Sequence, residues 1–159
     1  MPVYDRSFAP PAPVADVIVV HPLGGARSAL LRGKLDTGAD LTVIPEGLVA
    51  QLRISPKGRV WTRGYDGTYA QRALYYVRMV VEGFDVAAVR CVATNRTNVL
   101  VGRNVLNHFV ATLDGKSLTF RAEGTLTTLD AGHADYESRH TNRNPEANTE
   151  HHADDAVRR

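Results

Sequence analysis

The sequence predicts a mainly β domain that carries one or two short helices. Short runs rich in valine, isoleucine, threonine and tyrosine recur along residues 14–121, and such runs are typical of strands. Tight-turn signals separate several of them, at Gly24-Gly25, Asp66-Gly67 and Asp114-Gly115. Only two segments have features of a helix, so the helical content is expected to be small.

The first half of the domain is expected to form a hairpin, a short strand and a helix. Val14–Val20 is apolar and β-branched, and Ser28–Leu35 alternates roughly between apolar and polar residues. The Gly-Gly turn between these two runs predicts that they pair as a hairpin. Thr42–Ile44 is a further short strand. A proline at its start and leucines four residues apart predict a helix over residues 45–52.

The second half is expected to contain a longer hairpin, two more strands, a helix and a final hairpin. Arg59–Thr62 and Thr68–Val81 are the predicted strands of the longer hairpin, with a compact turn at Gly64–Gly67. The elements predicted after it are strands over Phe84–Ala93 and Val99–Val101, a helix over Arg103–Phe109, and hairpin strands over Thr112–Leu113 and Ser117–Arg121.

The composition divides the chain into three parts. Residues 1–13 contain four prolines, which remove backbone donors, so they are predicted to form a proline-rich arm. Residues 14–124 form the predicted folded domain. Residues 125–159 hold seven acidic residues and four arginines with few large apolar side chains, which predicts a disordered C-terminal tail. Because both ends are polar or proline-rich, they are also candidate self-processing sites.

Composition excludes several classes of function. Cys91 is the only cysteine, so an internal disulfide and a cysteine-based zinc cluster are both excluded. The histidines of the tail are irregularly spaced, and we predict neither a metal nor a cofactor.

No apolar run reaches membrane-spanning length, and no signal-peptide pattern begins the chain, so we expect a cytoplasmic protein. A net charge of +2 and a pI near 8.9 are too mild to predict nucleic-acid binding.

One segment stands out chemically, because residues 35–45 read LDTGADLTVIP. Asp36 follows a predicted strand, and the Thr37-Gly38 pair suits a tight turn whose amides face the carboxylate. Gly38 also permits a close approach of another backbone. Apolar residues resume at once, so the carboxylate is held between core strands and is a candidate for activating water. The alternative is an ordinary turn, which the tripeptide alone does not exclude.

This segment resembles the active-site segment of the retroviral-type (retropepsin-like) aspartic proteases. A second segment, VLVGRNVL at residues 99–106, resembles that family's apolar-apolar-Gly-Arg-Asn-x-Leu motif. The hairpin over residues 59–81 stands where the family has its flap. The resemblance covers residues 14–121 and implies a closed β-barrel lobe with a flap hairpin.

The resemblance also implies an activity, that of an aspartic endopeptidase cutting an extended polypeptide. The family needs two aspartates that share one proton and a water molecule. This chain has a single Asp-Thr-Gly, so the resemblance implies a homodimer in which each subunit supplies one Asp36. Thr37 and Gly38 complete the implied catalytic turn, with Thr37 bonding across the dimer axis.

Further roles follow from the resemblance alone. Asp40 and Arg103 correspond to an ion pair that supports the catalytic turn, and Asn104 belongs to the same support. The implied substrate-binding residues are Ala39, Asp40, Leu41, Gly64, Tyr65, Gly67 and Tyr69. The tip of the predicted flap has fewer glycines than some relatives and two tyrosines, either of which is able to reach over a substrate or to lie on the hairpin surface.

Two other interpretations stay open. The first is a dimeric peptide-binding or scaffold domain of the same fold that lacks turnover. The second, nucleic-acid binding, rests on the basic pI alone. Trp61 and the Tyr75-Tyr76 pair are interpreted as packing of the long hairpin, and Cys91 as a small buried apolar side chain.

Overall fold

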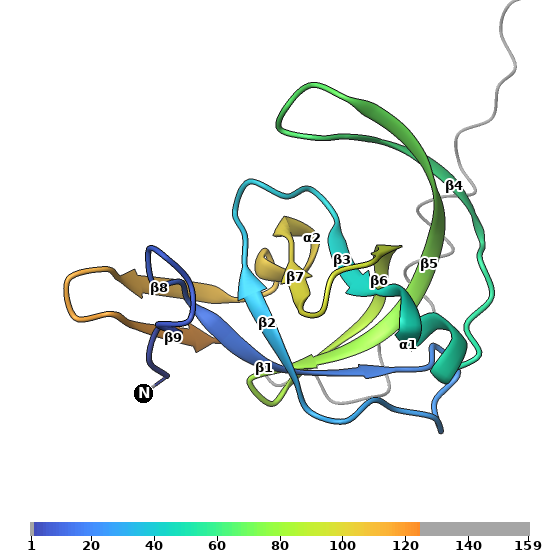
Figure 1. Cartoon of the computed structure of the whole chain (residues 1–159). Helices are drawn as coiled ribbons and strands as arrows, with labels where there is room; N and C mark the ends of the chain where they lie inside the picture. Colours follow the sequence, from blue (N-terminus) through green and yellow to red (C-terminus); the bar gives the residue numbers. More distant parts are fainter. Residues whose placement is uncertain (1, 125–159) are drawn as a thin grey trace, which may run out of the picture. The chain divides into compact units, whose positions relative to one another are not determined.

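The computed structural model describes residues 2–124, which form nine strands and two short helices (Figure 1). The predicted tail over residues 125–159 lies outside the described residues. In chain order the elements are β1 (Val14–Val20), β2 (Leu31–Leu35), β3 (Thr42–Pro45), α1 (Glu46–Gln51), β4 (Gly58–Arg63), β5 (Tyr69–Val81), β6 (Phe84–Thr94), β7 (Val99–Val101), α2 (Arg103–Leu106), β8 (Val110–Asp114) and β9 (Thr119–Glu123).

Six of the strands close into a barrel. The main sheet has the order β1-β2-β7-β3-β6-β5-β4, and an additional pairing of β1 with β5 closes the ring. β2–β7 and β3–β6 are parallel pairs, whereas the other pairs of the ring are antiparallel. β4 lies outside the ring and pairs with β5 to form a long hairpin. β8 and β9 form a separate two-stranded sheet. The prediction of a mainly β, closed barrel with two short helices is confirmed.

The core of the barrel is built largely from valines. Val17, Val77, Val99 and Val101 are fully buried, and burying one such side chain contributes about 1.5–3 kcal/mol. Gly33 lies among them on β2, where a Cβ atom would lie 2.9 Å from Cγ2 of Val101 and closer still to Val17. The strands β1, β2 and β7 therefore pack too closely for any side chain at Gly33.

Most strands differ from the prediction by one or two residues at one or both ends, and the two largest differences, in β2 and α2, have local reasons. β2 begins at Leu31 rather than Ser28, because Ser28 is used in the connection instead. Its hydroxyl accepts a hydrogen bond from the amide of Val19 at 3.0 Å and donates one to the carbonyl of Ala29 at 2.7 Å. α2 ends at Leu106, and the chain continues in tight turns to Phe109, whose ring contacts Phe84 with centroids 5.4 Å apart.

The N-terminal arm is fastened by backbone hydrogen bonds to the β8–β9 hairpin and to the end of β2. The amide of Tyr4 donates to the carbonyl of Leu118, and the amide of Phe120 donates to the carbonyl of Pro2. At the other end of the arm, the carbonyl of Pro13 accepts from the amide of Leu35 at 3.0 Å. The arm therefore ends beside the last residue of β2. Neither described helix has the length and apolarity needed to cross a bilayer.

Candidate active site

Asp36 is the first residue after β2 and is half-buried. Its amide donates to the carbonyl of Val101 on β7 at 3.0 Å, which ties the start of the turn to the barrel. Its Oδ1 accepts from the amide of Gly38 at 2.8 Å, and its carbonyl accepts from the amide of Ala39 at 3.3 Å. The carboxylate thus faces the amides of its own turn, the geometry that the sequence predicted.

The two residues after Asp36 are open to solvent. Thr37 and Gly38 are both exposed. Among residues 2–124, the Thr37 hydroxyl makes no hydrogen bond. A Cβ atom at Gly38 would lie 3.2 Å from Oδ1 of Asp36, so a side chain here would crowd the carboxylate.

The second motif supports the turn from below through Gly102 and Arg103. A Cβ atom at Gly102 would lie 2.7 Å from the carbonyl carbon of Leu41 and 3.0 Å from the amide nitrogen of Thr42. Only glycine permits this approach of two backbones. Next to it, the Arg103 amide donates to the Ala39 carbonyl at 2.8 Å.

Arg103 also forms an ion pair with Asp40, so the structure brings together two residues that lie 63 positions apart. Their side chains are 54% and 78% exposed. Solvent screens a pair as exposed as this, so its contribution to stability is small. The ion pair therefore adds little to the stability of the barrel, and it links the turn to the start of α2.

Asn104 supplies the buried part of the support. Its Oδ1 accepts from both the amide and the hydroxyl of Thr42, each at 2.9 Å, and its Nδ2 donates to the Arg90 carbonyl at 2.7 Å. Thr42 is fully buried, and its Oγ1 in turn accepts from the Gly102 amide at 3.1 Å. This network joins β3, β6 and α2 directly below the Asp36 turn.

The β4–β5 hairpin has two different faces, because residues opposite one another across a strand pair share a face. The inner face, as we call it, contains Val60 opposite Arg72 and Thr62 opposite Ala70. All of these except Arg72 are half-buried, so the inner face is turned toward the body of the protein. Figure 1 shows the hairpin curving over the loop that joins β2 to β3, which carries Asp36.

The outer face of this hairpin contains Ala73, which is half-buried, and five exposed residues, namely Arg59, Trp61, Arg63, Tyr69 and Gln71. Trp61 is 67% exposed, so the interpretation of this side chain as hairpin packing is wrong. The hairpin extends beyond the core, and within residues 2–124 no other element covers Trp61 there. The Arg63 guanidinium lies 5.5 Å from the centroid of the Tyr69 ring, which places this tyrosine on the outer face as well.

The tip of the hairpin is a tight turn that Asp66 holds together. The Gly64 amide donates to the Thr68 carbonyl at 2.8 Å, and Gly67 has a φ of 82°, a conformation that favours glycine. Oδ1 of Asp66 accepts from the amide and hydroxyl of Thr68, and these hydrogen bonds lower the pKa of the Asp66 carboxyl. Tyr65, at the end of the turn, is fully exposed.

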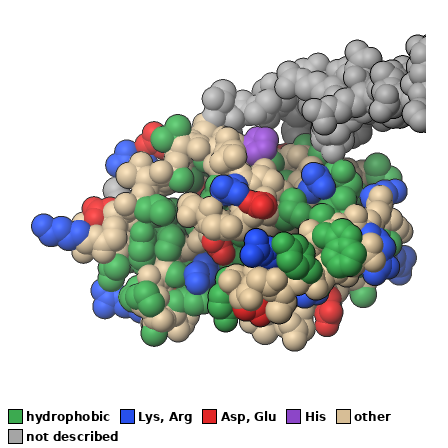
Figure 2. Space-filling model, turned by 90° about the horizontal axis from the view of Figure 1, so that it is seen from above, with side chains coloured by type: hydrophobic (Ala, Val, Ile, Leu, Met, Phe, Trp, Pro, Cys, Tyr) green, Lys and Arg blue, Asp and Glu red, His purple; other side chains and the backbone are tan. Residues whose placement is uncertain are grey.

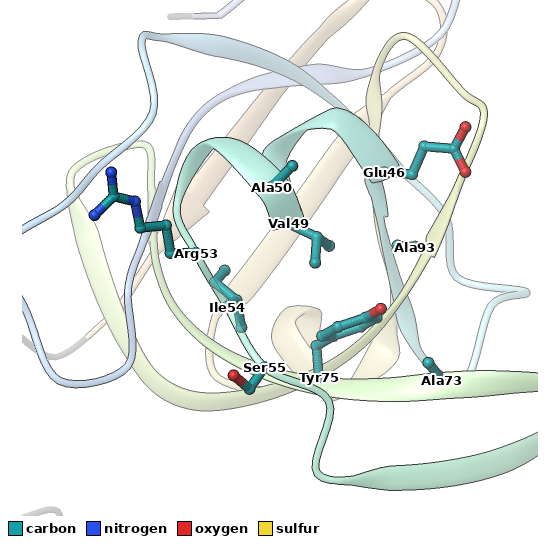
Figure 3. A pocket seen from close by; sticks show the side chains of 9 residues that line it. All are labelled: Glu46, Val49, Ala50, Arg53, Ile54, Ser55, Ala73, Tyr75 and Ala93. Atoms are coloured by element: carbon teal, nitrogen blue, oxygen red, sulfur yellow. The ribbon is translucent and has the colours of Figure 1, made fainter.

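A hollow of about 510 Å³ lies beside α1 and is separate from the Asp36 turn (Figure 3). Its wall includes Ala73 and Tyr75 of β5, and Ala73 shares the outer face of the hairpin with Arg59. The hollow is therefore on the opposite side of β5 from Arg72. Figure 3 shows Glu46 and Arg53 at opposite sides of it.

Other reactive side chains offer no second centre among residues 2–124. Cys91 is fully buried, and burial raises the pKa of its thiol to about 12, so it stays protonated and unreactive at neutral pH. No group of three histidine, cysteine or acidic side chains in this range has the arrangement of a metal site. The tail histidines lie outside the described residues.

Comparison with known proteins gives a match over both motifs. Residues 24–105, a little over half of the chain, match a family model described as aspartyl protease. No curated protein matches the chain significantly.

Several solved structures are similar to the chain. The simian foamy virus (mac) protease is 19% identical, with 59% of this chain and 91% of that chain covered and a TM-score of 0.45. The EIAV protease bound to an inhibitor is 20% identical, with 60% and 86% covered and a TM-score of 0.47. The foamy viral protease–reverse transcriptase with an RNA/DNA hybrid is 17% identical, with 79% and 14% covered and a TM-score of 0.46.

Proposed function

The chain belongs to the aspartyl protease family, and from this premise we propose that it is an aspartic endopeptidase that works as a homodimer. The observation that carries the proposal is the Asp36 turn, with its carboxylate at the end of β2 and both following residues exposed. The second motif supports this turn through Gly102, Arg103 and Asn104.

The chemistry requires a second carboxylate, which a second copy of the chain would supply. Two carboxylates about 3 Å apart cannot both ionise, so one is protonated while the other is charged. The charged group takes a proton from water as the water attacks the peptide carbonyl, and the protonated group gives its proton to the carbonyl oxygen. The first group then passes its proton to the amide nitrogen while the second takes its proton back, so that the C–N bond breaks and an amine and a carboxylic acid leave. Because the chain has one Asp-Thr-Gly, each subunit contributes one Asp36. The exposed Thr37 hydroxyl is free to bond across the two-fold axis.

The proposed substrate is an extended polypeptide that lies between the Asp36 turn and the inner face of the β4–β5 hairpin, which serves as the flap. Ala39, Asp40 and Leu41 would form the floor, and backbone groups of Gly64 and Gly67 would close over the substrate. Tyr65 extends from the tip and is the better placed of the two tyrosines, since Tyr69 stacks with Arg63 on the outer face. No metal or cofactor takes part in this proposal.

The first test is cleavage of a proteome-derived peptide library at several pH values between about pH 4 and about pH 7, because catalysis by an acid and a base makes the rate depend on pH. Wild type and Asp36→Asn are incubated in parallel, and the products are identified by mass spectrometry. We expect cuts by the wild type that the variant does not make. Cuts by both proteins would contradict the aspartic mechanism. Silence from a wild-type dimer would favour the peptide-binding domain without turnover.

The second test addresses the dimer through mixing. When wild type and Asp36→Asn are mixed one to one and allowed to exchange, about half of the wild-type chains pair with a variant chain. The activity per wild-type chain should then fall to about half, and further with excess variant. Unchanged activity would show that one chain contains the complete site. Addition of bovine serum albumin at equal mass controls for dilution and crowding.

A further inference from the structure

Arg72 is the only charged residue on the inner face of the β4–β5 hairpin between Gly58 and Leu74. The residues that share this face are Gly58, Val60, Thr62, Ala70 and Leu74. The other arginines of the two strands in this stretch, Arg59 and Arg63, are on the outer face. The inner face is therefore an apolar surface with one cation on it.

The charge of Arg72 has no counterion within the described residues. Its side chain is exposed and makes no ion pair there. On the proposed floor, Leu41 is apolar and Asp40 is already paired with Arg103. A guanidinium stays charged at every working pH and presents donors in a fork that fits a carboxylate. Figure 2 shows the molecule from above, where basic and hydrophobic side chains are interspersed; this view does not label Arg72.

We infer that Arg72 is a specificity-determining residue that selects polypeptides with an aspartate or glutamate close to the scissile bond. This inference rests on the proposed function, in which the substrate lies under the inner face. An acidic side chain there would pair with Arg72, whereas a lysine would meet a like charge that no acidic side chain of residues 2–124 neutralises. Substrate would cover the pair only in part, so we expect a preference of about 3- to 10-fold in kcat/KM for acidic over amide side chains.

The test uses peptides that differ by one residue. Each position within four residues of an identified cleavage site is occupied in turn by Asp, Asn or Lys, and kcat/KM is measured. Wild type should prefer Asp over Asn over Lys at one or two positions. Arg72→Glu should invert this order, and Arg72→Gln should abolish it. Arg59→Glu is the matched control, with the same change of charge on the outer face, and should keep the wild-type order.

Two results would overturn the inference: a wild type with no charge preference at any position, or an Arg59→Glu variant that inverts the order as fully as Arg72→Glu. The second result would mean that the net charge of the protein, and not a charge on the inner face, sets the preference for acidic or basic peptides. Circular dichroism should show that all variants fold, since both arginines are exposed.

A binding measurement separates this inference from the proposed function. Two pooled octapeptide libraries are used, one with Asp and Glu and the other with Asn and Gln in their place. The affinity for each library is measured for Asp36→Asn and for the double variant Asp36→Asn/Arg72→Glu. If binding prefers the acidic library and this preference requires Arg72, but wild type cleaves no peptide, the result would contradict the proposed protease activity. It would support the role of Arg72 in selecting acidic peptides. Cleavage by wild type with equal affinity for both libraries would support the protease and overturn the role of Arg72.

Discussion

The Asp36 turn and the β4–β5 hairpin are held in opposite ways. Backbone atoms of Val101, Gly102 and Arg103 contact the turn from below, and the buried Asn104–Thr42 network lies beneath it. The hairpin has its strand pairing and a tip turn, but most of its side chains between Gly58 and Arg72 are exposed. A rigid support under the Asp36 turn suits a carboxylate that must keep a fixed geometry. A hairpin with little support is able to open, which suits the admission and selection of substrates.

The largest expected effect is at Gly102, on the rigid side of this comparison. In Gly102→Ala the new Cβ atom would meet the backbone of Leu41 at 2.7 Å, so one of the two chains must shift. We expect a loss of about 3 kcal/mol in the free energy of unfolding. Cleavage should fall about 100-fold even where the protein is folded, because the Asp36 turn moves with Leu41. Urea unfolding and kcat/KM measure the two effects.

Gly47→Ala is the matched control for this prediction. A Cβ atom at Gly47 meets nothing within 4 Å, and the residue is in α1, where alanine is favoured over glycine by up to about 1 kcal/mol. This variant should be as stable as wild type or more so, with unchanged cleavage. Equal losses in both variants would contradict the close-approach argument.

The second expected effect is at Asn104. Asn104→Ala removes the acceptor of both the amide and the hydroxyl of buried Thr42, and leaving buried donors unpaired costs about 2 kcal/mol. Thermal and urea unfolding should show this loss, with cleavage reduced as well. Asn95→Ala, at an exposed position, should be neutral. A neutral Asn104→Ala would mean that water replaces the amide and that the network is dispensable.

The sequence predicted the contacts within short segments better than the contacts between distant segments. The strands β1 and β7 were predicted at their observed bounds, because β-branched runs between turn signals are a local pattern. The association of the two motifs came from resemblance, because no local pattern says that Asn104 reaches Thr42 across 62 positions. Trp61 was misjudged because apolar character indicates packing only when another element is near, and chain order alone does not say how far a hairpin extends.

A smaller effect is expected at the hairpin tip, where it should depend on pH. The pKa of Asp66 is lowered by the hydrogen bonds from Thr68, so the charged form stabilises the turn. This contribution is complete above the ordinary aspartate pKa near 4 and is lost as pH falls through the lower folded-state value. Asp66→Ala should exchange the amides of residues 64–68 severalfold faster at pH 6, with global stability unchanged. The difference from wild type should shrink as the pH falls well below the ordinary aspartate pKa and through the lower folded-state value.

Hydrogen exchange at Ala39 and Thr42, whose surroundings the Asp66 substitution leaves intact, is the internal control. Faster exchange at these floor residues in Asp66→Ala would contradict the separation between hairpin and floor. Equal exchange of wild type and variant at pH 6 would mean that the Thr68 hydrogen bonds do not hold the tip.

The smallest expected effect is at Trp61, although tryptophan is the largest side chain in the protein. Its ring is 67% exposed, so Trp61→Ala removes little buried surface and should change the free energy of unfolding by no more than about 0.5 kcal/mol. Phe120→Ala is the contrast, since Phe120 is 1% exposed and its loss should cost about 3–5 kcal/mol.

Trp61 is the chain's only tryptophan, so its fluorescence reports on the hairpin alone. The emission of the folded protein should already resemble that of the unfolded chain. A blue-shifted emission in the free protein would mean that something covers the outer face in solution, and the hairpin would then be as firmly held as the floor.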